Sequence, residues 1–124
     1  MNAQDLVGSY AGRGQEYLAK DGSVRRVPTS ARIVYTREGM VMAVSTPVDR
    51  EPTRMAEGVV AYAGRYDMKD GKVRLHIEVS FLPDRVGKTV VRTPSFEGNL
   101  LTLTTDPDAT GGVQKIYWER LPAA

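Results

Sequence analysis

The chain has 124 residues, of which 41% are hydrophobic and 26% are charged, and its formal net charge is +2. This length and composition predict one soluble globular domain that spans residues 1–124. The sequence has no cysteine, which excludes disulfides, thiol nucleophiles and cysteine-based metal sites, and its single histidine excludes a histidine-rich zinc centre. The 17 basic and 15 acidic residues are interspersed, so we expect no nucleic-acid-binding surface.

The N-terminus lacks the basic start and the apolar core of a signal peptide. No apolar run approaches the ~20 residues that are needed to span a bilayer. We therefore expect a cytoplasmic protein with no membrane contact, no metal and no cofactor, existing as a monomer or a homodimer.

Short segments rich in β-branched and aromatic residues alternate along the whole chain with turn signals such as Asp70-Gly71. They predict eight strands, at residues 8–18, 31–36, 40–45, 59–68, 72–81, 88–96, 100–105 and 113–120. One short helical turn is expected at residues 52–57, because Pro52 can begin it and Gly58 can end it.

Eight strands with short connections must protect their edges. Closing the sheet into an up-and-down barrel does so, and it leaves room inside for one small ligand. A two-sheet sandwich suits the same number of strands but usually needs long crossing connections. The predicted fold is therefore all-β, a single eight-stranded antiparallel barrel.

Residues 72–81 alternate strictly between apolar and polar side chains. The apolar set is Val73, Leu75, Ile77, Val79 and Phe81, and the polar set is Lys72, Arg74, His76, Glu78 and Ser80. Because successive strand side chains point to opposite faces, each set is expected on one face. If the polar face lines a cavity, His76 and Glu78 form a catalytic acid–base pair there, beside a ligand-binding Ser80. If that face is the exterior, the two cations of the polar set are simply solvated.

Two further groups are candidates for ligand contacts. Tyr35, Tyr62 and Tyr66 can orient a polar ligand group around a cavity, or they can fill the core of a small barrel. Met40 and Met42 can provide an adaptable apolar wall, or they can belong to an ordinary core. Both interpretations stay open for each group.

Several segments resemble the lipocalin-like domain family of small bacterial and fungal calycin-type barrels. They include Leu-Val-Gly-Ser-Tyr at 6–10, Tyr-Ala-Gly-Arg-Tyr at 62–66, His-Ile-Glu-Val-Ser at 76–80 and Trp-Glu-Arg at 118–120. The resemblance implies a lipocalin-type barrel with a small-molecule cavity. It also implies that Tyr10 packs beneath Arg120 and closes one end by a cation–π contact, which places the mouth at the other end. Arg85 replaces a tryptophan that is usual in the family, so an aromatic lid is lost there.

Three functions follow as alternatives. The first is a barrel that binds a small, largely apolar or aromatic molecule, a metabolic intermediate, in its central cavity. The second is a cofactor-free isomerase, cyclase or lyase that uses His76 and Glu78 with a tyrosine, and it requires His76 to point inward. The third is an interaction module with a filled interior and an exposed apolar patch.

Overall fold

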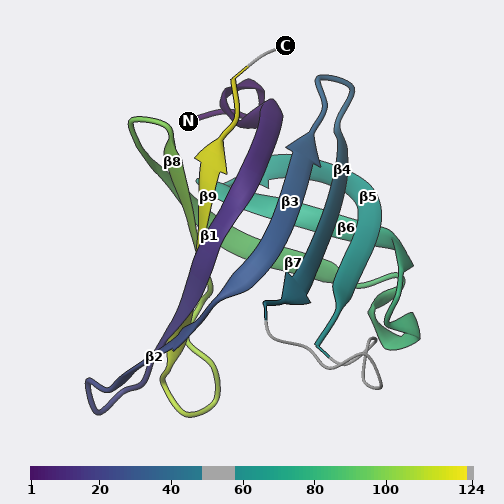
Figure 1. Ribbon diagram of the computed structural model, residues 1–124. Coiled ribbons are helices and arrows are strands. Elements are labelled where there is room, and N and C mark those ends of the chain that lie inside the picture. Colours follow the sequence, from purple (N-terminus) through teal and green to yellow (C-terminus); the bar gives the residue numbers. More distant parts are fainter. Residues whose placement is uncertain (49–57, 123–124) are drawn as a thin grey trace.

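Eight antiparallel strands close into a barrel in the computed structural model, which describes residues 1–48 and 58–122 (Figure 1). In ring order the strands are β1 (Gly8–Leu18), β3 (Thr29–Tyr35), β4 (Met40–Pro47), β5 (Val60–Lys69), β6 (Lys72–Ser80), β7 (Thr89–Glu97), β8 (Leu100–Thr104) and β9 (Val113–Arg120). Pairing of β9 with β1 closes the ring. The prediction of an eight-stranded all-β barrel is confirmed.

One strand lies outside the ring and was not predicted. β2 (Val24–Val27) pairs with the second half of β1, and β3 pairs with its first half, so that β1 extends beyond the barrel wall (Figure 1). Every residue of β2 is exposed. A strand without a buried face has no apolar alternation, and the sequence pattern therefore could not reveal it.

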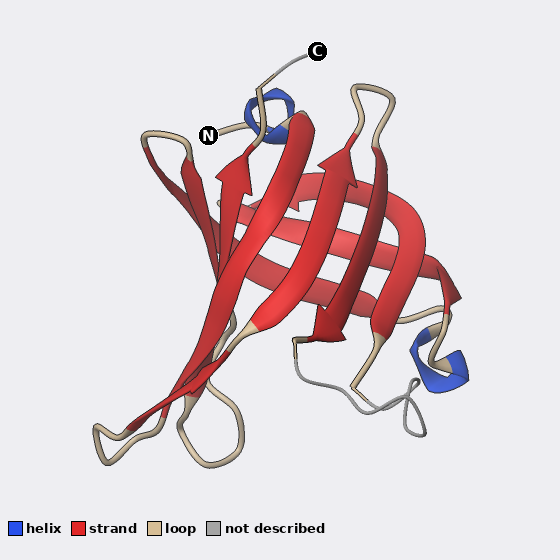
Figure 2. Cartoon of the chain, in the orientation of Figure 1, coloured by secondary structure: helices blue, strands red, loops and turns tan. Residues whose placement is uncertain are grey.

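The described residues also form two short 3₁₀ turns, which Figure 2 shows at opposite ends of the barrel. These are η1 (Ala3–Leu6), ahead of β1, and η3 (Pro83–Arg85), between β6 and β7. Neither was predicted. The helical turn expected at residues 52–57 lies outside the described residues.

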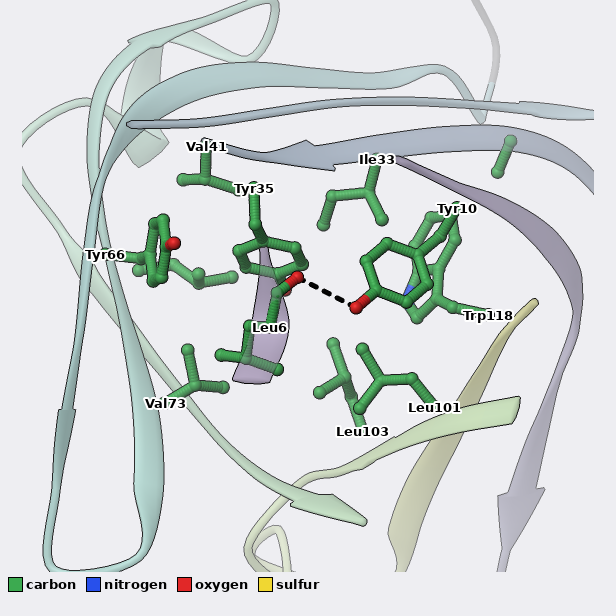
Figure 3. Packing of buried hydrophobic residues seen from close by; sticks show 12 residues of the cluster. Leu6, Tyr10, Ile33, Tyr35, Val41, Tyr66, Val73, Leu101, Leu103 and Trp118 are labelled. Carbon is green, nitrogen blue, oxygen red and sulfur yellow. Dashed lines mark hydrogen bonds between the residues drawn. The ribbon is translucent and has the colours of Figure 1, made fainter. Parts of the chain in front are cut away.

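The barrel end beneath η1 is packed solid by aromatic and aliphatic side chains (Figure 3). The rings of Tyr10 and Tyr35 meet edge to face with centroids 6.0 Å apart, and those of Tyr35 and Tyr66 meet likewise at 4.9 Å. The Tyr10 hydroxyl donates to the Leu6 carbonyl at 2.8 Å and accepts from the Arg120 guanidinium at 2.8 Å. Arg120 also lies over the Tyr10 ring, 5.3 Å from its centroid. The expected closure of one end by Tyr10 and Arg120 is confirmed.

A β-bulge interrupts the ladder between β5 and β6. Gly64 pairs with Ile77, but Ala63 pairs with Val79, so Glu78 is an additional residue on β6. The bulge reverses the faces of all later residues on this strand. The side chain of Ile77 is buried, whereas Val79 and Phe81 are 65% and 52% exposed. The prediction that the apolar set of residues 72–81 shares one face was therefore correct only as far as Ile77.

A glycine is required opposite this bulge because the two backbones nearly touch. A Cβ atom on Gly64 would lie 1.9 Å from the carbonyl oxygen of His76, far inside contact distance. The atom in the way belongs to the backbone and cannot rotate aside. Gly64 therefore permits the close approach of the two strands. That approach determines on which face of the sheet each β6 side chain after Ile77 lies.

This contact leads to a prediction for stability. We expect Gly64→Ala to lower the free energy of unfolding by about 3 kcal/mol or more, because the added methyl group displaces a strand of the barrel. Urea denaturation followed by circular dichroism measures the change. The matched control is Gly98→Ala, where the new methyl group meets no atom within 4 Å. That control incurs only the cost of a positive φ, about 1–2 kcal/mol. Equal losses in the two variants would contradict the role given to Gly64.

Candidate functional site

A cavity of about 170 Å³ occupies the half of the barrel that faces away from Tyr10 and Arg120. Its wall is mostly aliphatic and is formed by inward side chains of several strands, among them Ile33, Leu75, Ile77, Val90, Leu103 and Ile116. The barrel interior thus has a packed half and a hollow half. The cavity lies in the half opposite the closed end, where the resemblance placed the mouth.

A few polar groups interrupt this apolar wall. Arg92 reaches it from β7, Tyr62 from β5 and Arg85 from η3. The side chains of Gln15 and Gln114 also line the cavity and hydrogen-bond to each other. An apolar pocket with a small number of polar groups is typical of a site that orients an organic ligand.

Burial at the cavity raises the pKa of Tyr62 and lowers the pKa of Arg92. Burial raises the pKa of Tyr62 to about 12, so its hydroxyl is protonated at neutral pH. Burial lowers the pKa of Arg92, although a guanidinium keeps its charge under physiological conditions. The site therefore presents a neutral hydroxyl and a cation to its interior.

Of the three candidate tyrosines, only Tyr62 lines the cavity. Tyr35 is buried in the closed end between Tyr10 and Tyr66. The Tyr66 hydroxyl donates to the Thr36 carbonyl at 2.6 Å. Tyr62 and Tyr66 both point into the barrel. They belong to different halves of it, however.

The two candidate methionines lie on the outer face of the barrel. On β4 the buried side chain is Val41, so Met40 and Met42 point outward, and Met42 is 53% exposed. Met42 lines a shallow apolar hollow on the exterior together with the two side chains that the bulge turns outward, Val79 and Phe81. A ligand-binding role of these methionines stays a prediction, and the central cavity does not include them.

The polar set around His76 is divided between the two faces. Leu75 and Ile77, the residues on either side of His76 on β6, point into the barrel. The ring of His76 therefore points outward. There its Nε2 lies 3.0 Å from Asp67 and its Nδ1 lies 3.0 Å from Thr89. Glu78 is exposed at the bulge. Ser80, after the bulge, pairs with the cavity residue Tyr62.

The outer face thus holds His76 in a polar network. Two hydrogen bonds from Arg74, at 2.6 and 2.9 Å, and then the one from His76 hold the pKa of Asp67 below its usual range. The alternative in which the whole polar set lines the cavity is wrong. His76 lies before the bulge and points outward, and only the residues after the bulge, such as Ser80, change face. An acid–base role of His76 and Glu78 in the cavity required His76 to point inward, and that condition is not met.

Sequence analysis missed the cavity groups Arg92, Gln15, Gln114 and Trp118. A signal for Arg92 was present in β7, where the inward positions read Val90, Arg92, Pro94 and Phe96. A lone arginine in an apolar row of a strand indicates a buried cation that needs a partner. The glutamines gave no comparable signal, because a register shift between Gly12 and Gln15 breaks the alternation of β1.

Comparison with known proteins supports the same class of fold. The model of a lipocalin-like domain family matches residues 28–121, and the protein therefore belongs to that family. The structure is similar to the crystal structure of an uncharacterized protein from Bacteroides eggerthii, with a TM-score of 0.56 and 15% sequence identity. The similarity covers 94% of this chain and 100% of the other, and at this identity it shows the fold alone. The search of curated proteins gives no match.

Within residues 1–48 and 58–122, no helix is long and apolar enough to cross a membrane. The same ranges contain no group of three or more His, Cys, Asp or Glu side chains that could hold a metal ion.

The outward position of His76 leads to a prediction. We expect His76→Gln to change the free energy of unfolding by only about 0.5 kcal/mol, because it alters exposed hydrogen bonds. Urea denaturation measures this change. The matched control on the same strand is Leu75→Ala, which empties a buried position and should cost about 2–5 kcal/mol. A folded His76→Gln variant that no longer binds cavity ligands would contradict the outward assignment.

Proposed function

We propose that the protein binds a small, largely apolar organic molecule in the hollow half of the barrel. The observation that carries this proposal is the cavity itself, about 170 Å³ in volume and walled mainly by aliphatic side chains. Apolar burial favours ligand entry by roughly 25 cal/mol for each Å² of apolar surface removed from water. The few polar groups on the wall then fix the orientation of the ligand.

The size of the cavity limits the ligand to about one ring. A cavity of about 150 Å³ with aliphatic and aromatic walls accommodates benzene in another protein. A molecule with a single aromatic ring, or a branched aliphatic chain of similar bulk, suits the present volume. Larger molecules would have to extend through the mouth, where η3 contributes Arg85 to the wall.

The hollow interior also separates this proposal from the interaction module considered above. That alternative combined an exposed apolar patch with a filled barrel. The outer face does carry exposed apolar side chains, including Met42, Val79 and Phe81. The interior is filled only in the closed half, however, and this asymmetry favours a ligand site inside.

Filling the cavity tests the proposal. Ala43 points into the barrel and lines the cavity, and Ala43→Leu should therefore occupy part of its volume. We expect a loss of at least tenfold in affinity for ring-sized compounds, equivalent to about 1.4 kcal/mol. The fold should be retained, because filling a cavity is commonly neutral or stabilising. Titration of ¹⁵N-labelled protein with cyclohexanol, benzamide and benzoate, followed by NMR, measures the affinity.

The matched control is Ala63→Leu on the neighbouring strand. Ala63 pairs with the outward residue Met42 and lines the exterior hollow, so the same added bulk enters solvent. This variant should bind all three compounds as the native protein does. If none of the compounds perturbs resonances of cavity residues in the native protein, the proposed function is wrong for ligands of this size. If Ala43→Leu binds them normally, the ligand lies elsewhere.

A further inference from the structure

The arginine inside the barrel points to a more specific ligand chemistry. Arg92 pairs across the sheet with Val73, whose side chain is completely buried in the core. Its side chain therefore enters the barrel interior, where it lines the cavity beside aliphatic groups. A charged group in such surroundings is costly unless an opposite charge and hydrogen bonds compensate it.

Within the described part of the chain, that compensation is weak: Asp106 favours the charged form of Arg92, but its carboxylate is ion-paired with Lys72 at 2.9 Å and does not line the cavity. No Asp or Glu among these residues lines the cavity. A guanidinium has five N–H donors, and one nitrogen of Arg92 donates to the adjacent Val91 carbonyl at 2.9 Å. The other N–H groups of Arg92 have no hydrogen-bond partner among the residues described.

Several other arginines of the barrel have protein partners, in contrast to Arg92, although Arg32, like Arg92, donates only to the carbonyl of the preceding residue. Arg74 forms a two-pronged ion pair with Asp67, and Arg26 pairs with Glu16 at 2.9 Å. Arg120 is held at the closed end by the Tyr10 hydroxyl and the Asp5 carbonyl. These exposed or terminal guanidiniums have protein partners, whereas among the described residues Arg92 donates only to the Val91 carbonyl.

Two further groups make the cavity suitable for an anion. The Tyr62 hydroxyl is protonated and Tyr62 lines the same cavity as Arg92, so it offers a second donor to the same space. Arg85 adds another positive charge to the wall from η3. A guanidinium binds a carboxylate through two parallel hydrogen bonds, and this arrangement is specific for planar anions.

We propose that the cavity binds a small monocarboxylate, with the carboxylate on Arg92 and Tyr62 and the ring or branched chain against the aliphatic wall. This inference rests on the proposed ligand-binding function and narrows its ligand class. Arg85 assists by adding positive potential on the ligand's way to Arg92. Neutral molecules of the same shape leave the buried charge uncompensated and bind more weakly.

Pairs of acids and amides of equal shape test the inference. Benzoate is compared with benzamide, and 3-methylbutanoate with 3-methylbutanamide, at pH 7, where both acids are ionised. We expect the native protein to prefer each acid by on the order of 10- to 100-fold, as charge-assisted hydrogen bonds allow. NMR titration measures all four affinities, and the side-chain Nε–H resonance of Arg92 should shift with the acids only.

Three variants assign the preference to its source. Arg92→Leu should abolish the preference for acids while it keeps or improves binding of the amides. Arg92→Lys should retain part of the preference, because it keeps the charge but loses the planar two-pronged geometry. The control is Arg65→Leu, which removes an exposed arginine that points outward from β5 and should change nothing.

The possible results separate the two proposals. If the native protein binds the amides as tightly as the acids, the cavity binds ligands but the carboxylate inference is wrong. If it binds neither, the proposed function itself fails for ligands of this size. If Arg92→Leu does not fold, the acid–amide comparison and the Arg92→Lys variant still decide the question. An acid preference that stays unchanged in folded Arg92→Leu, or that Arg65→Leu also abolishes, would place the anion outside the cavity and overturn the inference.

Discussion

The contact between Gly64 and the His76 carbonyl group is the constraint on which the functional half of the barrel depends. Two backbones approach so closely there that a single methyl group would not fit. The approach accommodates one additional residue on β6, and every side chain after it changes face. Ser80 thereby pairs with Tyr62 near the mouth, whereas Val79 and Phe81 are turned toward solvent. Without this glycine the wall of the cavity and the outer surface would both differ.

The two halves of the interior use the same residue type in opposite ways. At the closed end, Arg120 is compensated by the Tyr10 hydroxyl, by a backbone carbonyl and by the faces of two aromatic rings. There arginine completes the packing of a plug, because one guanidinium nitrogen donates to two protein oxygens and two rings lie against the cation, although its buried Nε has no partner among the described residues. In the hollow half, Arg92 lacks comparable partners among the described residues. A cation without internal compensation is available to an external anion. This difference in hydrogen bonding and charge compensation distinguishes a structural arginine from a binding one.

The outer face of the barrel has its own organisation, which is independent of the cavity. His76, Asp67, Arg74 and Thr89 form a hydrogen-bonded network across β5, β6 and β7. Polar cross-strand contacts of this kind contribute only modestly to stability, because water competes for each partner. The single histidine, which stands out in the sequence by its rarity, is thus part of an exterior network. Histidine is a common catalytic residue, but its type does not determine on which face of the barrel it lies.

The sequence by itself determined the class of the fold, the approximate bounds of the eight barrel strands, and the closure of one end by Tyr10 and Arg120. These features depend on local alternation, turn residues and the quoted family segments, all of which can be read along the chain. Only the tertiary structure decided which side chains meet inside. A bulge requires a neighbouring strand, so strict alternation over residues 72–81 could not reveal that Val79 and Phe81 change face. Likewise, whether Arg92 has a partner depends on strands far apart in the sequence, because burial and charge compensation are properties of the assembled barrel.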